Sequence, residues 1–422
     1  MKTLMRALLT VLIGAWMGAF AQSASAAPAR EHWVATWSAY MQGTPFQAGG
    51  GGPQTPAVKG QTIRQTAKIS VGGPRMRVFI SNEFGDKPLK VGAASVAISD
   101  GAGAVKAGAI ARLTFNGKAS VSIPPGVRIL SDAADLKTAA LQDVTVSLYF
   151  PEETPLSTYH MEDVRGSSPR DALASGAILS TPGDFTQTAA MPVQPSKDHV
   201  YPPFVSSIQT VAPASTPVVV IFGDTKSEGP GFWPNPLRDR LAPKGIAFAN
   251  VSQYAGTLFL HRPEGTGLSR FDQNVLSAAG VTHVFLFNAS NDVNMPGMAN
   301  NGRYVMDPST RIPVEDVIMG IKQSIDRAHA AGLKVIGATL IPFEGVLREG
   351  YASADHMQMR DEVNRWIRTS GAFDAVVDFD AAIRDPAHPQ RIKPEFDVGN
   401  HFTPSAAGGR AMAAAINEAL FR

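Results

Sequence analysis

Cysteine is absent from this chain of 422 residues. That absence excludes disulfide bonds and thiolate-ligated metals, so the stability of the folded chain must come from a large hydrophobic core. The chain also lacks a large excess of positive or negative charge. Its net charge of +2 is too small to indicate a nucleic-acid partner or an anionic membrane surface. The nine histidines form neither an HExxH nor an HxH pair, so we expect no bound metal and no cofactor.

Long hydrophobic runs are missing after the N-terminus. Lys2 and Arg6 precede an apolar stretch from Ala7 to Ala21, and Ala24-Ser25-Ala26 is typical of a cleavage site. This pattern predicts a secretory signal peptide over residues 1–26 and a secreted or periplasmic protein. No later run approaches the ~18 apolar residues that a spanning helix needs, so we expect no membrane span.

The residues after the signal peptide show a β pattern. Segments such as TIRQTAKISVGG, RMRVFISNEFG and VTVSLYF alternate apolar and polar residues, and Gly, Pro, Asn or Asp separate them. This alternation predicts an antiparallel β-sandwich or jelly-roll-like domain over residues 27–212.

The pattern changes after Pro217. Continuous apolar strands now alternate with helical segments, as in Val314 to Ala331 followed by LKVIGATL. This order is typical of a parallel sheet with helices on its faces, and it predicts an α/β domain over residues 213–422. A Pro- and Ser-rich stretch at 196–216 is the expected junction.

The segment VVVIFGDTKSEG, Val218 to Gly229, contains a buried strand that stops at Gly223 and Asp224. It resembles the first signature block of the SGNH/GDSL hydrolases, in which a nucleophilic serine follows the Gly-Asp pair. Thr225 stands at that position here. The resemblance implies a three-layer α/β/α domain with a parallel sheet.

The last block of that family carries its catalytic Asp and His three residues apart. The segment DVGNHFTPSAAGGRAMAA, Asp397 to Ala414, resembles the family run DSGDHLHPNDAGYRAMAD. This resemblance places Asn400 at the position of the catalytic Asp and Thr403 at that of the catalytic His. All three triad positions are therefore substituted.

Two further blocks supply the oxyanion hole in this family. FLFNASNDV, Phe285 to Val293, resembles the third block, and the resemblance implies that Asn291 is the oxyanion donor. NVSQYAGTLFL resembles the second block. Gly256 takes the oxyanion-hole position if one residue is inserted, and Ala255 takes it otherwise.

Three functions remain open. The favoured hypothesis is a protein with little or no esterase activity that binds a carbohydrate or an acylated carbohydrate, because neither Asn400 nor Thr403 can exchange a proton near neutral pH. The second is a re-purposed glycoside hydrolase or lyase in the same cleft. The third is an ester hydrolase with Thr225 as nucleophile. The candidate catalytic residues for these two enzymes are Thr225, Asp224, Lys226, Glu228, Asp397 and His401. The sequence gives no oligomeric state.

Overall fold

The computed structural model describes residues 31–43, 57–161, 176–194, 201–227, 232–261 and 265–422. The signal peptide predicted for residues 1–26 lies outside these ranges. From Trp33 to Arg422 the chain forms one compact unit. No helix in the described ranges combines the length and the apolar character that crossing a membrane requires.

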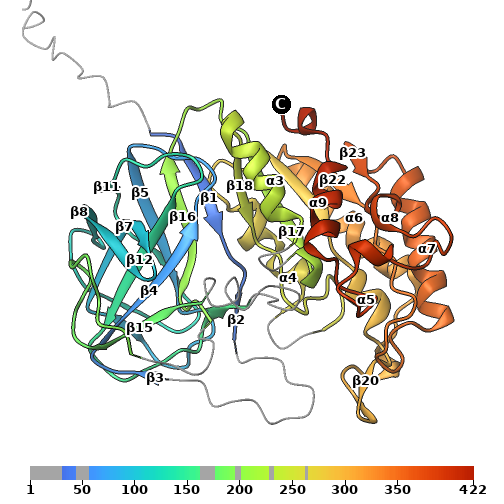
Figure 1. The fold of residues 1–422 in the computed structure, drawn as a ribbon, viewed down its shortest axis with the longest axis horizontal. Helices are drawn as coiled ribbons and strands as arrows, with labels where there is room; N and C mark the ends of the chain where they lie inside the picture. Colours follow the sequence, from blue (N-terminus) through green and yellow to red (C-terminus); the bar gives the residue numbers. More distant parts are fainter. Residues whose placement is uncertain (1–30, 44–56, 162–175, 195–200, 228–231, 262–264) are drawn as a thin grey trace, which may run out of the picture. The chain divides into compact units, whose positions relative to one another are not determined.

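The first half of the chain contains two five-stranded sheets, and all their strand pairs are antiparallel (Figure 1). This confirms the predicted β-rich region, which is consistent with a β-sandwich. One sheet contains β1 (Trp33–Ser38), β16 (Val205–Val211), β5 (Arg75–Ser81), β10 (Arg128–Leu130) and β11 (Ala134–Asp135). The other contains β15 (Ile178–Pro182), β4 (Gln61–Lys68), β12 (Asp143–Phe150), β7 (Ala93–Gly101) and β8 (Ala104–Leu113).

Four pairs of short strands form separate two-stranded sheets in the described ranges. They are β2 (Met41–Gln42) with β14 (Tyr159–His160), β3 (Ala57–Val58) with β13 (Thr154–Pro155), β6 (Leu89–Val91) with β9 (Val121–Ile123), and β20 (Ala299–Asn300) with β21 (Arg303–Tyr304).

The second half of the chain is built on a five-stranded parallel sheet, which confirms the predicted α/β/α class. Its strand order is β18 (Ala247–Asn250), β17 (Val218–Gly223), β19 (His283–Phe287), β22 (Lys334–Ala338) and β23 (Ala375–Val377). All residues of β17 are buried, because this strand lies inside the sheet and both of its faces are covered.

Helices alternate with these strands. They are α3 (Pro234–Leu241), α4 (Gly267–Phe271), α5 (Ser290–Asn294), α6 (Val314–Ala330), α7 (Ala354–Thr369), α8 (Phe379–Ile383) and α9 (Ala406–Ala414). Further helical turns are η1 (Thr225–Ser227), η2 (Ala242–Lys244), η3 (Asp272–Leu276), η4 (Pro308–Thr310), η5 (Pro394–Phe396) and η6 (Glu418–Phe421). The longest helix, α6, follows the expected period: Val317, Ile321, Ile325 and Ala328 are buried along one stripe.

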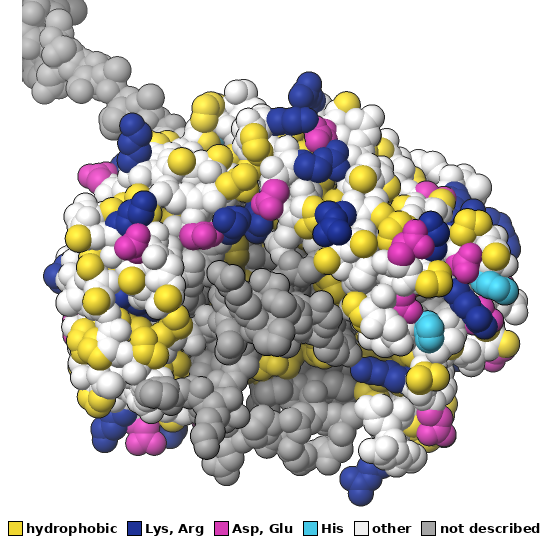
Figure 2. Space-filling model, in the orientation of Figure 1, with side chains coloured by type: hydrophobic (Ala, Val, Ile, Leu, Met, Phe, Trp, Pro, Cys, Tyr) yellow, Lys and Arg dark blue, Asp and Glu magenta, His cyan; other side chains and the backbone are white. Residues whose placement is uncertain are grey.

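The change from antiparallel to parallel pairing falls between β16 and β17. The predicted domain boundary at residue 212 lies in this interval and stays a prediction. Hydrogen bonds link the two halves: the Ser70 hydroxyl accepts from the Phe248 amide at 2.8 Å and donates to the Phe248 carbonyl at 3.2 Å. Figure 2 shows that acidic and basic side chains are interspersed on the face drawn.

An aromatic cluster fills the core beside the parallel sheet. Trp233 is fully buried, and its ring centroid lies 4.8 Å from that of Phe285 and 5.1 Å from that of Phe379. Rings packed edge to face or tilted at such distances stabilise a core beyond the area that they bury. Trp233 therefore supports the sheet directly after the first signature block.

Replacing Trp233 with alanine should lower the free energy of unfolding by about 3–5 kcal/mol, because the change leaves a large cavity between Phe285 and Phe379. Denaturant unfolding followed by circular dichroism measures the change. Val376→Ala is the control, since Val376 lies at the protein surface. A loss below about 1 kcal/mol in Trp233→Ala would contradict this packing.

Candidate functional site

The candidate site forms where two neighbouring parallel strands end. β17 stops at Gly223 and leads into Asp224 and the turn η1, while β19 stops at Phe287 and leads into α5. Gly223 and Phe287 are paired in the sheet register. The turn at 224–227 and the segment at 288–292 are therefore side by side at the carboxyl edge of the sheet, where open α/β sheets place their ligands.

A buried polar chain links the first block to the third. The Lys226 ammonium donates to the Ser290 hydroxyl at 3.0 Å, and that hydroxyl donates to the Asp224 carboxylate. The backbone amide of Lys226 also donates to Asp224 at 3.1 Å. All three residues are buried. Asp224 and Lys226 thus hold the turn against α5 through Ser290.

Thr225 is buried, and its hydroxyl oxygen accepts a hydrogen bond from the Ala255 amide at 2.8 Å. The Asn291 side-chain amide donates to the Gly256 carbonyl at 2.6 Å. Ala255 and Gly256, the two candidates for the oxyanion-hole position, therefore both contact the site: Ala255 through its N–H and Gly256 through its carbonyl. Of the two, Ala255 directs its N–H to the Thr225 hydroxyl, whereas Gly256 donates its own N–H to the Gln253 carbonyl at 3.1 Å.

Asp292 connects the second and third blocks. Its buried carboxylate accepts hydrogen bonds from three consecutive backbone amides, those of Leu258, Phe259 and Leu260, at 2.7–2.8 Å. Burial raises the pKa of Asp292 from 3.8 to about 6, although these three amides act in the opposite direction. The charge of Asp224 also raises the pKa of Asp292.

Asn400 and Thr403, which the resemblance places at the Asp and His positions, lie in the loop after η5. The Asn400 side-chain amide donates to the Thr403 hydroxyl at 3.0 Å, and the Asn400 side-chain oxygen accepts from the Thr403 amide at 2.8 Å. The two side chains thus bond to each other, and neither titrates near neutral pH.

A histidine and a carboxylate do meet in the same loop. His401 Nδ1 lies 2.8 Å from Asp397 Oδ2, and the His401 side chain is 44% exposed whereas that of Asp397 is 4% exposed. His401 has a φ of +61°, a strained value for a residue other than glycine, and Asp397 stabilises it by accepting from the His401 amide at 3.1 Å.

Phe402 brings this loop to the turn after β17. The Lys226 ammonium lies 4.8 Å from the centroid of the Phe402 ring, a distance at which a cation is attracted to an aromatic face. Since Phe402 is flanked by His401 and Thr403, the last block lies next to the first. Glu228, also a candidate catalytic residue, lies outside the described residues.

Ser290 is the residue that sequence reasoning missed. Its hydroxyl contacts both Asp224 and Lys226, and each of these two residues is more than 60 positions from Ser290 along the chain. A signal was available, because Ser290 directly precedes Asn291 and Asp292 in the third block. Among the described residues, no three acidic or histidine side chains converge in an arrangement that could hold a metal ion.

Comparison with known families decides the assignment of this half of the chain. The family model GDSL-like Lipase/Acylhydrolase matches residues 219–416, which includes the turn, α5 and the loop of Asn400 and Thr403. Residues 219–416 belong to this family. The predicted resemblance is therefore confirmed for the GDSL-like domain.

Two solved structures show partial similarity to this chain. A GDSL-like lipase from Bacteroides thetaiotaomicron VPI-5482 is 18% identical, with a TM-score of 0.36 over 48% of this chain and 87% of the other. A carbohydrate esterase family 2 enzyme plus carbohydrate binding domain from Corynascus thermopiles (Myceliophthora fergusii) is 13% identical, with a TM-score of 0.37 over 90% and 98% of the two chains. Among curated proteins, none matches this sequence.

The raised pKa of Asp292 predicts a pH dependence of the stability of the GDSL-like domain. The pKa of Asp292 is higher in the folded protein than in the unfolded chain, so protonation of Asp292 stabilises the fold. This contribution to the free energy of unfolding is fully present below about pH 4 and is lost as the pH rises through about 6. In Asp292→Asn this dependence should be absent. The free energy of unfolding of the natural protein, relative to the variant, should fall by about 2 kcal/mol between pH 4 and pH 7.

Asp307→Asn is the matched control for this measurement. Hydrogen bonds from Ser309 lower the pKa of Asp307, so its stabilisation is present above the unfolded pKa and is lost as the pH falls. Denaturant titrations at pH 4, 5, 6 and 7 compare the three proteins. The prediction fails if the difference between the natural protein and Asp292→Asn is constant over this range or has the opposite sign.

Proposed function

We propose that this protein is a secreted member of the GDSL-like acylhydrolase family that binds a carbohydrate or an acylated carbohydrate and hydrolyses esters slowly or not at all. The observation that carries the proposal is the hydrogen bond between Asn400 and Thr403 at 3.0 Å. Two neutral side chains bonded to each other cannot replace a His–Asp pair, because neither accepts a proton from a nucleophile and returns it to a leaving group.

The surroundings of Thr225 support the same conclusion. The Thr225 hydroxyl oxygen accepts a hydrogen bond from the Ala255 N–H at 2.8 Å, and this bond holds the hydroxyl in place. Lys226, the nearest basic group along the chain, donates to Ser290 and lies over the Phe402 ring. These contacts direct the Lys226 side-chain nitrogen to Ser290 and Phe402.

Binding of a sugar is supported by the side chains around the turn. In the sequence, Tyr254 directly precedes Ala255 and Phe259 lies three positions after Gly256, and both side chains are half-buried. Ala255 and Gly256 contact Thr225 and Asn291. Aromatic faces next to amide and hydroxyl groups suit sugars, which stack through their C–H faces and hydrogen-bond through their hydroxyls.

One observation favours a second function, a re-purposed glycoside hydrolase or lyase. Asp397 fixes the orientation of His401 at 2.8 Å while 44% of the His401 side chain stays exposed, and such a pair can act as a general base. In that case His401→Gln should abolish cleavage of a polysaccharide detected by mass spectrometry. In the favoured function, the same panel of polysaccharides gives binding by calorimetry and no product.

The assay for the proposed function uses an activated aryl acetate at neutral pH. The natural protein should show no turnover that approaches the ~10 per second of a typical enzyme. Thr225→Ser alone should change nothing, because Thr403 still stands at the position of the catalytic His. The triple change Thr225→Ser, Asn400→Asp and Thr403→His should raise the rate by about 10²-fold or more over Thr225→Ser, the usual contribution of a general base.

The single change Thr225→Ser serves as the matched control for the triple change, since both carry the same nucleophile. Turnover near 10 per second in the natural protein that disappears in Thr225→Ala would overturn the proposal and identify Thr225 as a nucleophile. A silent triple variant with unchanged thermal stability would show that the pocket no longer suits acyl transfer.

A further inference from the structure

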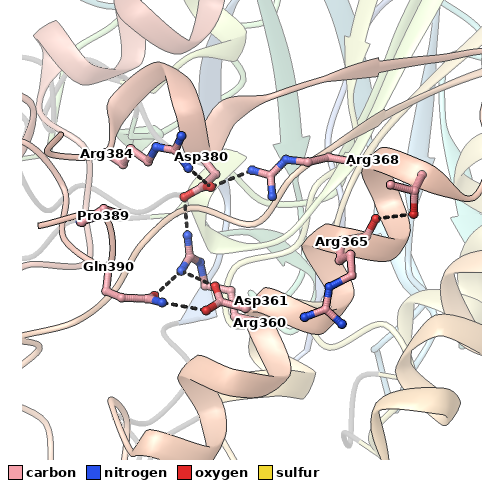
Figure 3. A pocket seen from close by; sticks show the side chains of 9 residues that line it. Arg360, Asp361, Arg365, Arg368, Asp380, Arg384, Pro389 and Gln390 are labelled. Atoms are coloured by element: carbon pink, nitrogen blue, oxygen red, sulfur yellow. Dashed lines mark hydrogen bonds and ion pairs between the residues drawn. The ribbon is translucent and has the colours of Figure 1, made fainter.

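A pocket lies between α7, α8 and the segment at 384–390, and no residue of the turn at 224–227 lines it (Figure 3). Its volume is about 350 Å³, and four of its lining side chains are arginines: Arg360, Arg365, Arg368 and Arg384. Arg365 and Arg368 are three positions apart on α7, so they share one helix face. Figure 2 shows charged side chains of both signs over this side of the molecule.

One buried carboxylate organises three of these arginines. The Asp380 side chain is only 5% exposed, and it accepts hydrogen bonds from Arg360, from Arg368 at 2.6 Å and from Arg384 at 3.2 Å. Figure 3 shows the three guanidinium groups converging on Asp380. This convergence fixes the floor of the pocket before any ligand binds.

Arg360 is held on several sides. It is buried, and it donates to the Leu340 carbonyl, to Gln390 and to Asp361 as well as to Asp380. Its position is therefore set by the fold. Ordering a side chain in advance removes an entropy cost that a ligand would otherwise have to offset.

The other arginines keep hydrogen-bond donors that the fold does not use. A guanidinium has five N–H donors. Within the part of the chain that the structure describes, the Arg384 guanidinium makes one hydrogen bond, to Asp380, and the side chain is 42% exposed. Arg365 lines the pocket and is exposed, and its guanidinium makes no side-chain hydrogen bond within the described ranges.

The charge around the pocket is positive. The four arginines face three carboxylates, since Asp361 and Asp380 line the pocket and Asp378 pairs with Arg368 at 2.9 Å. Four arginines and three carboxylates leave one positive charge at the pocket. Most N–H donors of Arg365 and Arg384 are also left for a ligand.

We propose that this pocket, which Arg365 and Arg384 both line, binds a small oxyanion, the carboxylate, sulfate or phosphate group of a ligand. Guanidinium forks match the geometry of such groups and bind them through paired hydrogen bonds. The pocket holds neither Thr225 nor Asn291, so this inference is independent of the proposed function.

Binding is measured by isothermal titration calorimetry on the full-length protein with three probes: sodium glucuronate, inorganic sulfate and inorganic phosphate, each at low ionic strength. Glucose is the uncharged reference. We expect at least one anion to bind and glucose not to compete with it. A preference for glucuronate assigns the site to a carboxylate, and a preference for sulfate or phosphate assigns it to a tetrahedral anion.

Arg365→Gln and Arg384→Gln should each weaken the preferred anion by about tenfold, the loss expected when a charged hydrogen-bonding partner is removed. Arg303→Gln is the matched control, since it removes the same charge from an exposed position on β21. Thermal unfolding checks that each variant is folded.

Two results would overturn the proposal. One is the absence of binding by all three anions, which would leave the arginines a purely structural ion-pair network. The other is an equal loss of affinity in Arg303→Gln, which would mean that the anion responds to net charge alone. Failure of either kind leaves the esterase assay unaffected, because that assay depends on Thr225, Asn400 and Thr403.

Discussion

The site depends on one buried carboxylate more than on any other group. Asp292 accepts three consecutive backbone amides from 258–260, so it fixes the second block against the third. That arrangement places the Ala255 N–H on Thr225 and the Gly256 carbonyl on Asn291. Because an unpaired buried amide or carboxylate is costly, the bonds of Asp292 keep this edge of the sheet in one conformation whatever residue follows Asp224.

Under the proposed function, this separation of framework from chemistry explains how a GDSL-like domain keeps its geometry with other residues at the triad positions. Asp224, Ser290 and Lys226 form a buried chain of hydrogen bonds that holds the first turn, and Asn400 and Thr403 satisfy each other in the last loop. Each substituted residue therefore has a partner of its own. These bonds stabilise the site through framework contacts alone.

Much of the fold could be predicted from the sequence, because burial imposes patterns that are visible in it. The apolar run at 218–222 predicts a strand covered on both faces, and the alternation at 143–150 predicts an antiparallel one. The spacing of Asn400 and Thr403 likewise predicts that they are neighbours. Ser290 between Asp224 and Lys226 could not be predicted, since that contact joins residues distant in the chain. The pocket arginines were missed because charged residues on a helix resemble an ordinary solvent-facing surface.

The central claim is that no nucleophile in the GDSL-like domain is activated. A fluorophosphonate probe tests it most directly, because such probes phosphonylate a hydroxyl only when a neighbouring group removes its proton. After incubation of the natural protein with an excess of the probe, the intact mass should be unchanged. A covalent adduct that peptide mapping assigns to Thr225 or Ser290 would contradict the account.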